Sequence, residues 1–480
     1  MRALCFVISF TWISLCSSAQ WFQPALSGAE LRADALLLKE VLRESHAGLY
    51  AYTQPAAFEE LFAAFEGDDS VSYHQAFHLL SQVVDGVRDG HTWIVPSDAQ
   101  TRFILERERF IPFSLALSGQ KLTIYGNFSA HPGLKSGTEV VEINGISIRD
   151  MVRELLPYVT ADGINLSGKL AAMNEQFWWY YGLHFGFPAE HQVVVRDERG
   201  RLDSISVPAI TMNDRIQAIY EVYPKYSDSR DAFSWKFDGS TAYLRIPRFS
   251  GMKLNTFEQW IDRFFQEVAQ HKCSDLVIDL RGNGGGIEGY ENILLSYLNT
   301  LPIERYNAVY MSNPRSSYYK HLHKGGLRWL EDWVYAAIEF DQTEDGRWLR
   351  RERFKRTKFC PSNTFDGPVY IWVDGDVFSG ASEFASIARS HVENCTLIGQ
   401  PTCGGQAGHT SGYYYLLKLP NTGFSVNIPR VRFDLAIKTK RTGGGLMPDV
   451  LIESNVWEEK DPLQVFQQAM RAQWTTNERN

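Results

Sequence analysis

In the second half of the chain, short apolar runs alternate with segments of helical periodicity, and this alternation constrains the fold most strongly. Residues 276–280 read as a buried strand that leads directly into the glycine-rich sequence at 281–286 and then into a helical pattern. A second apolar run, at 369–373, is followed by another helical pattern. Strands that alternate with helices in this way fold as α/β domains. We therefore predict an α/β core over residues 236–456, with a charged and aromatic insertion at 301–365.

The N-terminal region, residues 20–105, has helical periodicity. Four apolar or aromatic residues recur at the spacing of one helix face: Tyr73, Phe77, Leu80 and Val84. The region ends in the sequence Asp-Gly-His-Thr at 89–92, where glycine favours the end of a helix. A short strand is expected at 92–95. His91 is therefore predicted to lie at the junction between two elements.

Between residues 106 and 165 the apolar residues recur with a period of two, which predicts a small β module. The sequence GLKSGTEVVEINGISIRDMV, residues 133–152, resembles the second half of a PDZ domain, a fold that binds extended peptides by adding them as a strand. A plain β module beside the active site is the alternative. Residues 166–235, with an aromatic run at 177–181, are predicted as a connection or β extension, and 457–480 as a C-terminal helix or tail.

The first 19 residues have the form of a signal peptide. Arg2 precedes an apolar run at 3–16, and the small residues Ser17, Ser18 and Ala19 follow. A lipid anchor on Cys16 is a weaker alternative. No later stretch contains the roughly 20 apolar residues that span a bilayer. We therefore expect an exported, periplasmic or extracellular protein without a membrane span, and the net charge of -8 gives it no general attraction to nucleic acid.

Four cysteines follow the predicted signal peptide: Cys273, Cys360, Cys395 and Cys403. An oxidising compartment would allow one or two disulfides, and three pairings remain open. The spacing of these cysteines matches no compact zinc motif, so we assign no metal.

Ser379 follows the apolar run at 369–373 and precedes the helical pattern of 380–390. A serine at this place lies at the positive end of the helix, where the N–H of Gly380 has no partner within the helix. This position suits a nucleophile. The alternative is that Ser379 only caps the helix, with Ser382 or Glu383 completing the cap.

The glycine-rich sequence at 281–286 forms a second strand-to-helix corner, whose backbone amides could bind an anion. Gly284, Gly286 and Gly289 also match the dinucleotide-binding template, but no acidic residue ends a second strand at the required distance. We therefore disfavour a dinucleotide site. Arg281 and Asp279 are expected to support the corner.

Four segments, in this order, resemble the C-terminal processing, or tail-specific, serine peptidase family: 275–286, 373–385, 397–408 and 443–450. The resemblance implies a core of repeated strand-strand-helix units, of the ClpP/crotonase-like type. It also implies that Ser379 is the nucleophile of an acyl-enzyme mechanism. The expected substrate is a protein or peptide, no cofactor is needed, and a homo-oligomer is allowed.

The base implied by the resemblance depends on the branch of the family. One branch uses a lysine in the glycine-rich loop that here spans 399–406, and this loop contains none. The other branch, similar to tricorn and the secreted chlamydial protease, uses a histidine from the upstream region. His91 fits that role, with His409 and His391 as alternatives. An imidazole can take the serine proton at neutral pH and return it to the leaving amine.

The third catalytic group departs from the pattern of this branch, because Thr442 stands where a glutamate is expected. Asp449 or Asp434 could supply the orienting carboxylate instead. For the oxyanion hole we predict the backbone N–H of Gly380 and that of Gly285 or Gly284. Each such donor is typically worth about 100- to 1,000-fold in rate.

A non-catalytic protein that binds peptides or hydrophobic ligands is the main alternative, because similar folds occur in retinoid-binding relatives. An esterase of the α/β-hydrolase type would need glycine at positions 377 and 381. Valine and alanine stand there, so this class is disfavoured.

Overall fold

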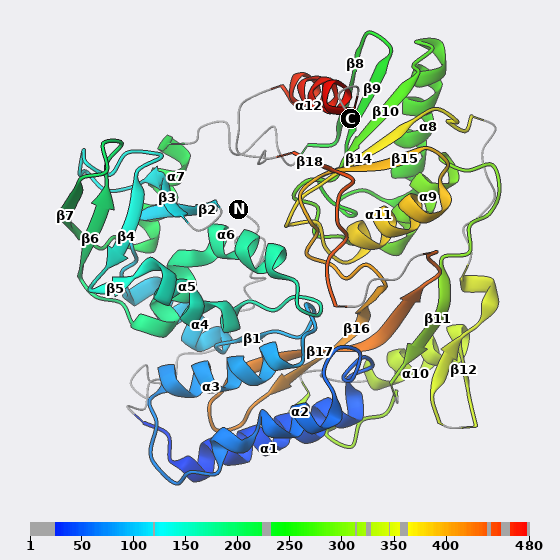
Figure 1. Ribbon diagram of the computed structural model, residues 1–480. Coiled ribbons are helices and arrows are strands. Elements are labelled where there is room, and N and C mark those ends of the chain that lie inside the picture. The colour runs from blue at the N-terminus through cyan, green and yellow to red at the C-terminus, as the bar shows by residue number, and fades with distance from the viewer. Residues whose placement is uncertain are drawn as a thin grey trace.

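The computed structural model describes residues 25–118, 121–222, 232–312, 314–322, 328–344, 346–355, 363–438, 443–452 and 461–477. The predicted signal peptide, Cys360 and Thr442 lie outside these residues. Three six-stranded sheets organise the described part of the chain (Figure 1). No helix within these ranges combines the length and apolar character that crossing a membrane requires.

The core sheet is largely parallel. Its strands, in spatial order, are β18 (Val450–Leu451), β15 (Cys395–Gly399), β14 (Val369–Val373), β10 (Asp275–Asp279), β9 (Thr241–Arg245) and β8 (Ser234–Asp238). The pairs from β18 to β9 are parallel, whereas β8 runs antiparallel to β9. The predicted α/β core is confirmed.

Helices cover both faces of the core sheet because its strands are apolar on both sides. Leu276 and Ile278 pack into the cluster that includes α8 (Leu254–Gln270), α9 (Glu288–Ser296) and α11 (Gly380–His391). Val277, between them, faces the other side and packs with Leu463 of α12 (Pro462–Asn477). Figure 1 shows α12 apart from the other three helices, across the sheet.

A bridging sheet connects the N-terminal region to the core. Its order is β1 (Ile94–Val95), β17 (Ser425–Leu435), β11 (Tyr306–Met311), β13 (Trp348–Arg350) and β12 (Phe340–Gln342), and β16 (Gly408–Lys418) pairs with β17. The predicted insertion at 301–365 thus contributes strands, together with α10 (Arg328–Glu339). The N-terminal helices α1 (Gly28–Ser45), α2 (Pro55–Glu60) and α3 (Tyr73–Gly86) lie beside β16 and β17 (Figure 1).

The upstream sheet is antiparallel and extends beyond the predicted boundary at residue 165. Its strands are β2 (Phe113–Ser118), β3 (Lys121–Asn127), β4 (Glu139–Ile143), β6 (Glu190–Arg196) and β7 (Leu202–Pro208), with β5 (Ile146–Ser147) paired to β4. Its neighbours are α4 (Asp98–Arg107), α5 (Ile148–Leu155), α6 (Leu166–Phe185) and α7 (Met212–Val222).

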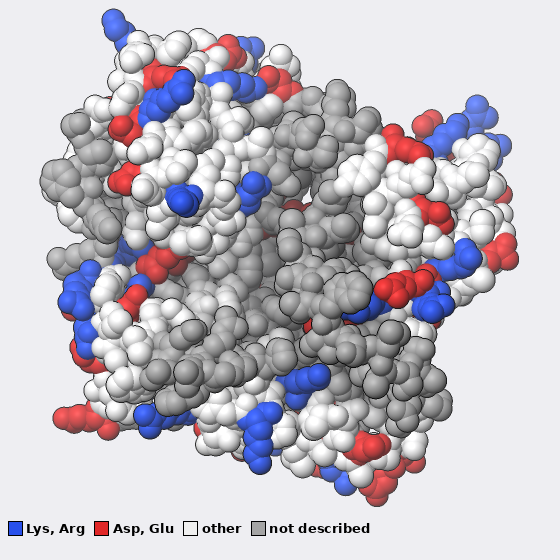
Figure 2. Space-filling view, turned by 180° about the vertical axis from the view of Figure 1, so that it is seen from behind, with Lys and Arg blue, Asp and Glu red and all other residues white. Residues whose placement is uncertain are grey.

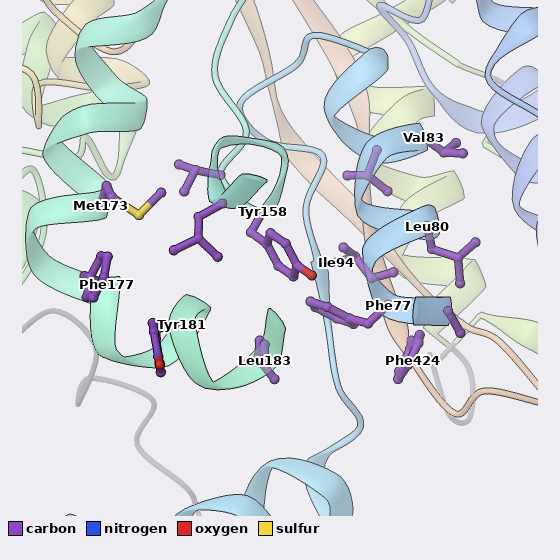
Figure 3. Close-up of a cluster of buried hydrophobic side chains, with 14 of the residues drawn as sticks. Phe77, Leu80, Val83, Ile94, Tyr158, Met173, Phe177, Tyr181, Leu183 and Phe424 are labelled. Carbon is purple, nitrogen blue, oxygen red and sulfur yellow. The ribbon is translucent and has the colours of Figure 1, made fainter. Parts of the chain in front are cut away.

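The aromatic run at 177–181 lies in α6, not in a β extension. Met173, Phe177 and Tyr181 are four residues apart, so they share one buried face of this helix (Figure 3). In the same hydrophobic cluster, the Phe77 ring lies 5.5 Å from the ring of Tyr158 and 5.1 Å from that of Phe424. These contacts tie the N-terminal helices to the upstream region and to the β16–β17 hairpin.

On the face of the molecule in Figure 2, basic and acidic side chains of the described residues are interspersed. Cys273, Cys395 and Cys403 are free thiols, so no disulfide joins these three.

Candidate active site

Ser379 lies at a strained turn between β14 and α11. Its backbone has φ 51° and ψ −129°, a conformation that side chains rarely adopt and that persists only where the surrounding structure holds it. The residue occupies the N-cap position, yet its side chain makes no capping hydrogen bond. The interpretation of Ser379 as only a helix cap is therefore not supported. A sharp strand-to-helix turn of this kind presents the hydroxyl above the sheet.

The glycine-rich corner packs directly against this turn. A side chain at Gly285 would place its Cβ 2.8 Å from Ser379 Cβ and 2.8 Å from the backbone nitrogen of Gly380, and the φ of Gly285 is +94°. Only glycine combines that backbone conformation with so close an approach. The corner and the Ser379 turn are therefore fitted to each other.

His91 brings its ring to Ser379 from the N-terminal region. The distance between His91 Nε2 and Ser379 Oγ is 3.0 Å, although the two residues are 288 positions apart. The ring is 8 % exposed and stacks on Phe378, with ring centroids 4.3 Å apart. Both residues were predicted to belong to one site, and the structure brings them within hydrogen-bonding distance.

The backbone around His91 is fixed by the bridging sheet. Ile94 and Val95 of β1 pair with Val426 and Ser425 of β17. Asn427 Nδ2 donates to the His91 carbonyl oxygen at 2.7 Å, and the Asn427 N–H donates to the carbonyl of Trp93 at 2.9 Å. The short strand after the Asp-Gly-His-Thr sequence therefore delivers the imidazole.

Burial keeps the His91 imidazole neutral. Desolvation lowers the pKa of His91 to about 3, although the carboxylate of Asp89 acts in the opposite direction. A neutral imidazole that accepts a proton at Nε2 carries its own proton on Nδ1. The Nδ1 atom is buried and has no hydrogen-bond partner among the described residues.

The two alternative histidines are occupied elsewhere. His409 Nε2 lies 2.9 Å from Glu383 Oε2. Burial lowers the pKa of His409, but the hydrogen bond to Glu383, the charge of Glu383 and that of Asp162 together raise the pKa overall. His391 lies at the C-terminal end of α11, where its Nε2 is 2.5 Å from the carbonyl oxygen of Ala436.

Glu383 belongs to a buried ionic network behind Ser379. Its carboxylate contacts Arg305 and Tyr306 as well as His409. The Arg305 guanidinium also donates to Glu291 Oε2 at 2.9 Å. Glu383 thus has a structural place in the core.

The carboxylates proposed from sequence do not lie beside the His91 ring. Asp449 accepts hydrogen bonds from the Arg389 guanidinium, at 2.8 and 2.9 Å, and from the N–H of Leu397. Asp434 follows Phe433 on β17, and the Phe433 ring stacks on His409. Because side chains alternate along a strand, Asp434 points to the opposite face of the sheet.

Two other carboxylates surround the His91 ring. One ring nitrogen of His91 and one carboxylate oxygen each from Asp89 and Asp162 lie within 4.8 Å of one another. Asp89 belongs to the same loop as His91. Asp162 comes from the segment before α6, and no local pattern in the sequence marked it.

Asp162 is fully buried and joins two loops. Its Oδ1 accepts the N–H of Gly90 and its Oδ2 accepts the N–H of Gly405, both at 2.9 Å. Burial, and then the nearby charge of Asp89, raise the pKa of Asp162 to about 6. Asp162 therefore changes its charge close to neutral pH.

The backbone N–H groups predicted to form the oxyanion hole differ in their hydrogen-bond partners. The Gly380 N–H has no acceptor among the described residues, as expected at the first position of a helix. The Gly285 N–H, by contrast, donates to Asn283 Oδ1 at 2.8 Å. Asn283 itself is fixed by its carbonyl oxygen, which accepts the N–H of Phe378 at 3.1 Å. Of the two corner amides, Gly284 is therefore the better candidate.

Comparisons with known proteins identify the family of the core and proteins of similar fold. Residues 240–464 match the model of peptidase family S41. Residues 240–464 of the chain therefore belong to peptidase family S41. This family consists of serine-type peptidases, and the matched residues include the glycine-rich corner and Ser379.

Two solved structures of mature CPAF have a similar fold. Mature CPAF is 14% identical over 88% of this chain and 93% of its own, with a TM-score of 0.59. Mature CPAF complexed with lactacystin is 14% identical over 88% of this chain and 94% of its own, with a TM-score of 0.58. Identities this low support the shared fold only. No curated protein sequence matches the chain significantly.

Proposed function

We propose that this S41 peptidase is an exported enzyme that hydrolyses peptide bonds of proteins or peptides through an acyl-enzyme on Ser379. His91 is the general base. The observation that carries the proposal is the 3.0 Å distance between His91 Nε2 and Ser379 Oγ. It supports a histidine-based mechanism, because the imidazole is neutral and directed at the hydroxyl.

The reaction has two halves. In the first, Ser379 Oγ attacks the carbonyl carbon of the scissile peptide bond while His91 Nε2 takes the hydroxyl proton. The tetrahedral intermediate then collapses, the C–N bond breaks, and the imidazolium returns that proton to the leaving amine. In the second half, His91 deprotonates a water molecule, which attacks the ester carbonyl. The acid product leaves, and the proton returns to Ser379.

The oxyanion of each intermediate is stabilised by the Gly380 N–H, with the Gly284 N–H as the second donor. The Gly380 N–H belongs to the unpaired first turn of α11, where the helix also carries its positive end. These donors are fixed before substrate arrives, so little reorganisation is needed in the transition state.

We also propose a ClpP/crotonase-like type for the core, a PDZ-like upstream module and export of the protein. The order strand, helix, strand recurs in β9–α8–β10 and β14–α11–β15, which supports a core of the ClpP/crotonase-like type. The antiparallel upstream sheet suits a PDZ-like module. Export rests on the signal-peptide form of residues 1–19, and N-terminal sequencing of the protein recovered outside the cytoplasm tests it, with Gln20 as the expected first residue.

A fluorophosphonate probe tests the nucleophile. We expect the wild-type protein to be labelled, S379A to remain unlabelled, and H91Q to be labelled far more slowly. Ser386→Ala is a matched control in the same helix, because the Ser386 hydroxyl has no partner among the described residues. Labelling that persists in S379A would rule out this nucleophile. A wild-type protein that neither reacts nor cleaves casein, but binds peptides, would instead support the non-catalytic alternative.

A further inference from the structure

The His91 ring has one polar atom without a partner. For Nε2 to accept the Ser379 proton, Nδ1 must carry a proton of its own, and this Nδ1 is buried without an acceptor. A buried donor without an acceptor destabilises the state in which it has no partner. When His91 becomes an imidazolium during catalysis, the same N–H becomes part of a buried cation. An acceptor near Nδ1 is therefore needed more in the transition state than at rest.

Two carboxylates lie close enough to serve, namely those of Asp89 and Asp162. A carboxylate has about four lone-pair sites. Asp89 already accepts three hydrogen bonds, from the His91 N–H and from the hydroxyls of Thr92 and Thr410. The first two bonds hold Asp89 Oδ1 against its own loop, and the third ties Asp89 Oδ2 to β16. Asp89 therefore has little capacity left for the imidazole.

Asp162 has more capacity and a better-defined position. It accepts two hydrogen bonds, one on each oxygen, from the N–H groups of Gly90 and Gly405. Each oxygen keeps about one lone pair. The bond to Gly90 holds Asp162 against the residue that precedes His91, and Asp162 is completely buried. Any motion of the His91 loop therefore carries the carboxylate with it.

We propose that Asp162 is the positioning residue of His91, and that its carboxylate accepts the Nδ1 proton either directly or through one water molecule. One ring nitrogen of His91 lies within 4.8 Å of a carboxylate oxygen of Asp162, a separation that a single water spans with two ordinary hydrogen bonds. This inference rests on the proposed function, because it assigns Asp162 to the reaction of Ser379 and His91. Asp162 would supply the orienting carboxylate from the upstream region. The resemblance to the histidine branch of the family places a glutamate at the position of Thr442, and threonine cannot take that role.

The charge of Asp162 depends on its surroundings. Six ionisable groups face or influence it: Asp89 and His91 of the histidine loop, Tyr52 after α1, Cys403 of the glycine-rich loop, His409 of β16 and Arg432 of β17. Because the pKa of Asp162 is raised to about 6, its carboxylate is ionised above that pH and neutral below it. Only the ionised form stabilises an imidazolium. Activity should therefore fall as the pH decreases through about 6.

The test compares D162N with the wild-type protein and with D449N, which changes an aspartate that is bound to Arg389 of α11 and not to the His91 loop. Casein hydrolysis gives kcat/KM as a function of pH, and thermal unfolding shows whether each variant is folded. We expect D162N to lose about 100- to 10,000-fold in kcat/KM, by analogy with removal of the aspartate from a serine peptidase triad. We also expect that kcat/KM of D162N no longer decreases as the pH falls through about 6, a decrease called the acid limb of the pH profile. D449N should keep both the wild-type kcat/KM and the acid limb.

If Asp162 only stabilised the fold, its replacement would not change the acid limb. The pH profile therefore distinguishes a positioning role of Asp162 from a purely structural one.

If D162N fails to fold, proton NMR of the wild-type protein replaces the kinetic test. A hydrogen-bonded Nδ1 proton of His91, identified by its absence in H91Q, is expected downfield. Wild-type tautomers with the proton on Nε2 would contradict the proposal. A folded D162N with nearly normal kcat/KM and an unchanged limb would overturn it while leaving the Ser379 chemistry intact. An unlabelled wild-type protein would instead overturn the peptidase mechanism itself.

Discussion

Asn427 of β17 holds His91 in place by its backbone: the Asn427 side-chain amide donates to the His91 carbonyl oxygen at 2.7 Å. Asn427 is 7% exposed, so this bond is shielded from water. It joins the bridging sheet to the loop that supplies the base. The strand that follows the histidine is only two residues long, Ile94–Val95. The Asn427 bond therefore carries a large share of the positioning.

We predict that N427A reduces kcat/KM by one to two orders of magnitude, because a small displacement of a catalytic group has that effect. Its unfolding free energy should fall by about 1–3 kcal/mol, since the His91 carbonyl loses a partner. Asn307→Ala is the matched control. Asn307 Nδ2 donates to the carbonyl oxygen of Leu435 at 2.9 Å, elsewhere on the same sheet. Equal losses of activity in both variants would contradict the positioning role.

A second prediction concerns the glycine corner. In G285A the added Cβ would lie 2.8 Å from both Ser379 Cβ and the Gly380 nitrogen, so the nucleophile or the oxyanion donor must move. We expect fluorophosphonate labelling to be lost. Gly239→Ala is the control, because Gly239 also has a positive φ, +57°, but has no atom within 4 Å of an added Cβ. Both variants carry backbone strain. If only G285A loses labelling, the loss is caused by the contact of the added Cβ with Ser379 and Gly380 and not by the strain.

The third prediction concerns Asp279, which supports the glycine-rich corner at 281–286. Asp279 is 1% exposed and accepts hydrogen bonds from Arg281, Arg245 and Tyr243. Burial raises the pKa of Asp279, but the two guanidinium groups outweigh it, so the pKa is lowered overall. D279N leaves two partly uncompensated cations and should cost about 3–5 kcal/mol of unfolding free energy.

D449N breaks an ion pair whose side chains are 46% and 37% exposed, and it should cost on the order of 1 kcal/mol. Urea denaturation compares the two variants. The contribution of Asp279 is present above its ordinary pKa and is lost as the pH falls through its lowered native pKa. The difference between wild type and D279N should therefore shrink in acid. A difference that grows in acid would contradict the assignment.

The fourth prediction separates the two neighbouring histidines. H409Q removes a group paired with Glu383, 5.8 Å from the His91 ring, and should keep kcat/KM within about tenfold, whereas H91Q should lose most activity. Because the pKa of His409 is raised, its contribution to stability is complete below the ordinary histidine pKa and is lost as the pH rises through the native value. Wild type and H409Q should therefore converge in stability at alkaline pH. A collapse of activity in H409Q with normal activity in H91Q would reverse the assignment of the base.

Local patterns in the sequence were sufficient for several parts of the site. The apolar run at 275–279 and the glycines after it predict a strand and a tight corner, and Ser379 is predicted at a similar corner. α6 was missed, although Met173, Phe177 and Tyr181 recur every fourth residue. Their large aromatic neighbours obscured a period that indicates a helix.

The sequence by itself determined the α/β order, the glycine corner and the absence of a lysine from the loop at 399–406, because each depends on neighbouring residues. Only the tertiary structure decided which groups surround the imidazole. Asp162 lies 72 positions after Gly90 and 243 before Gly405, yet it binds the amides of both. Such contacts arise from the packing of separate regions around a common core, and no local periodicity or turn preference encodes them.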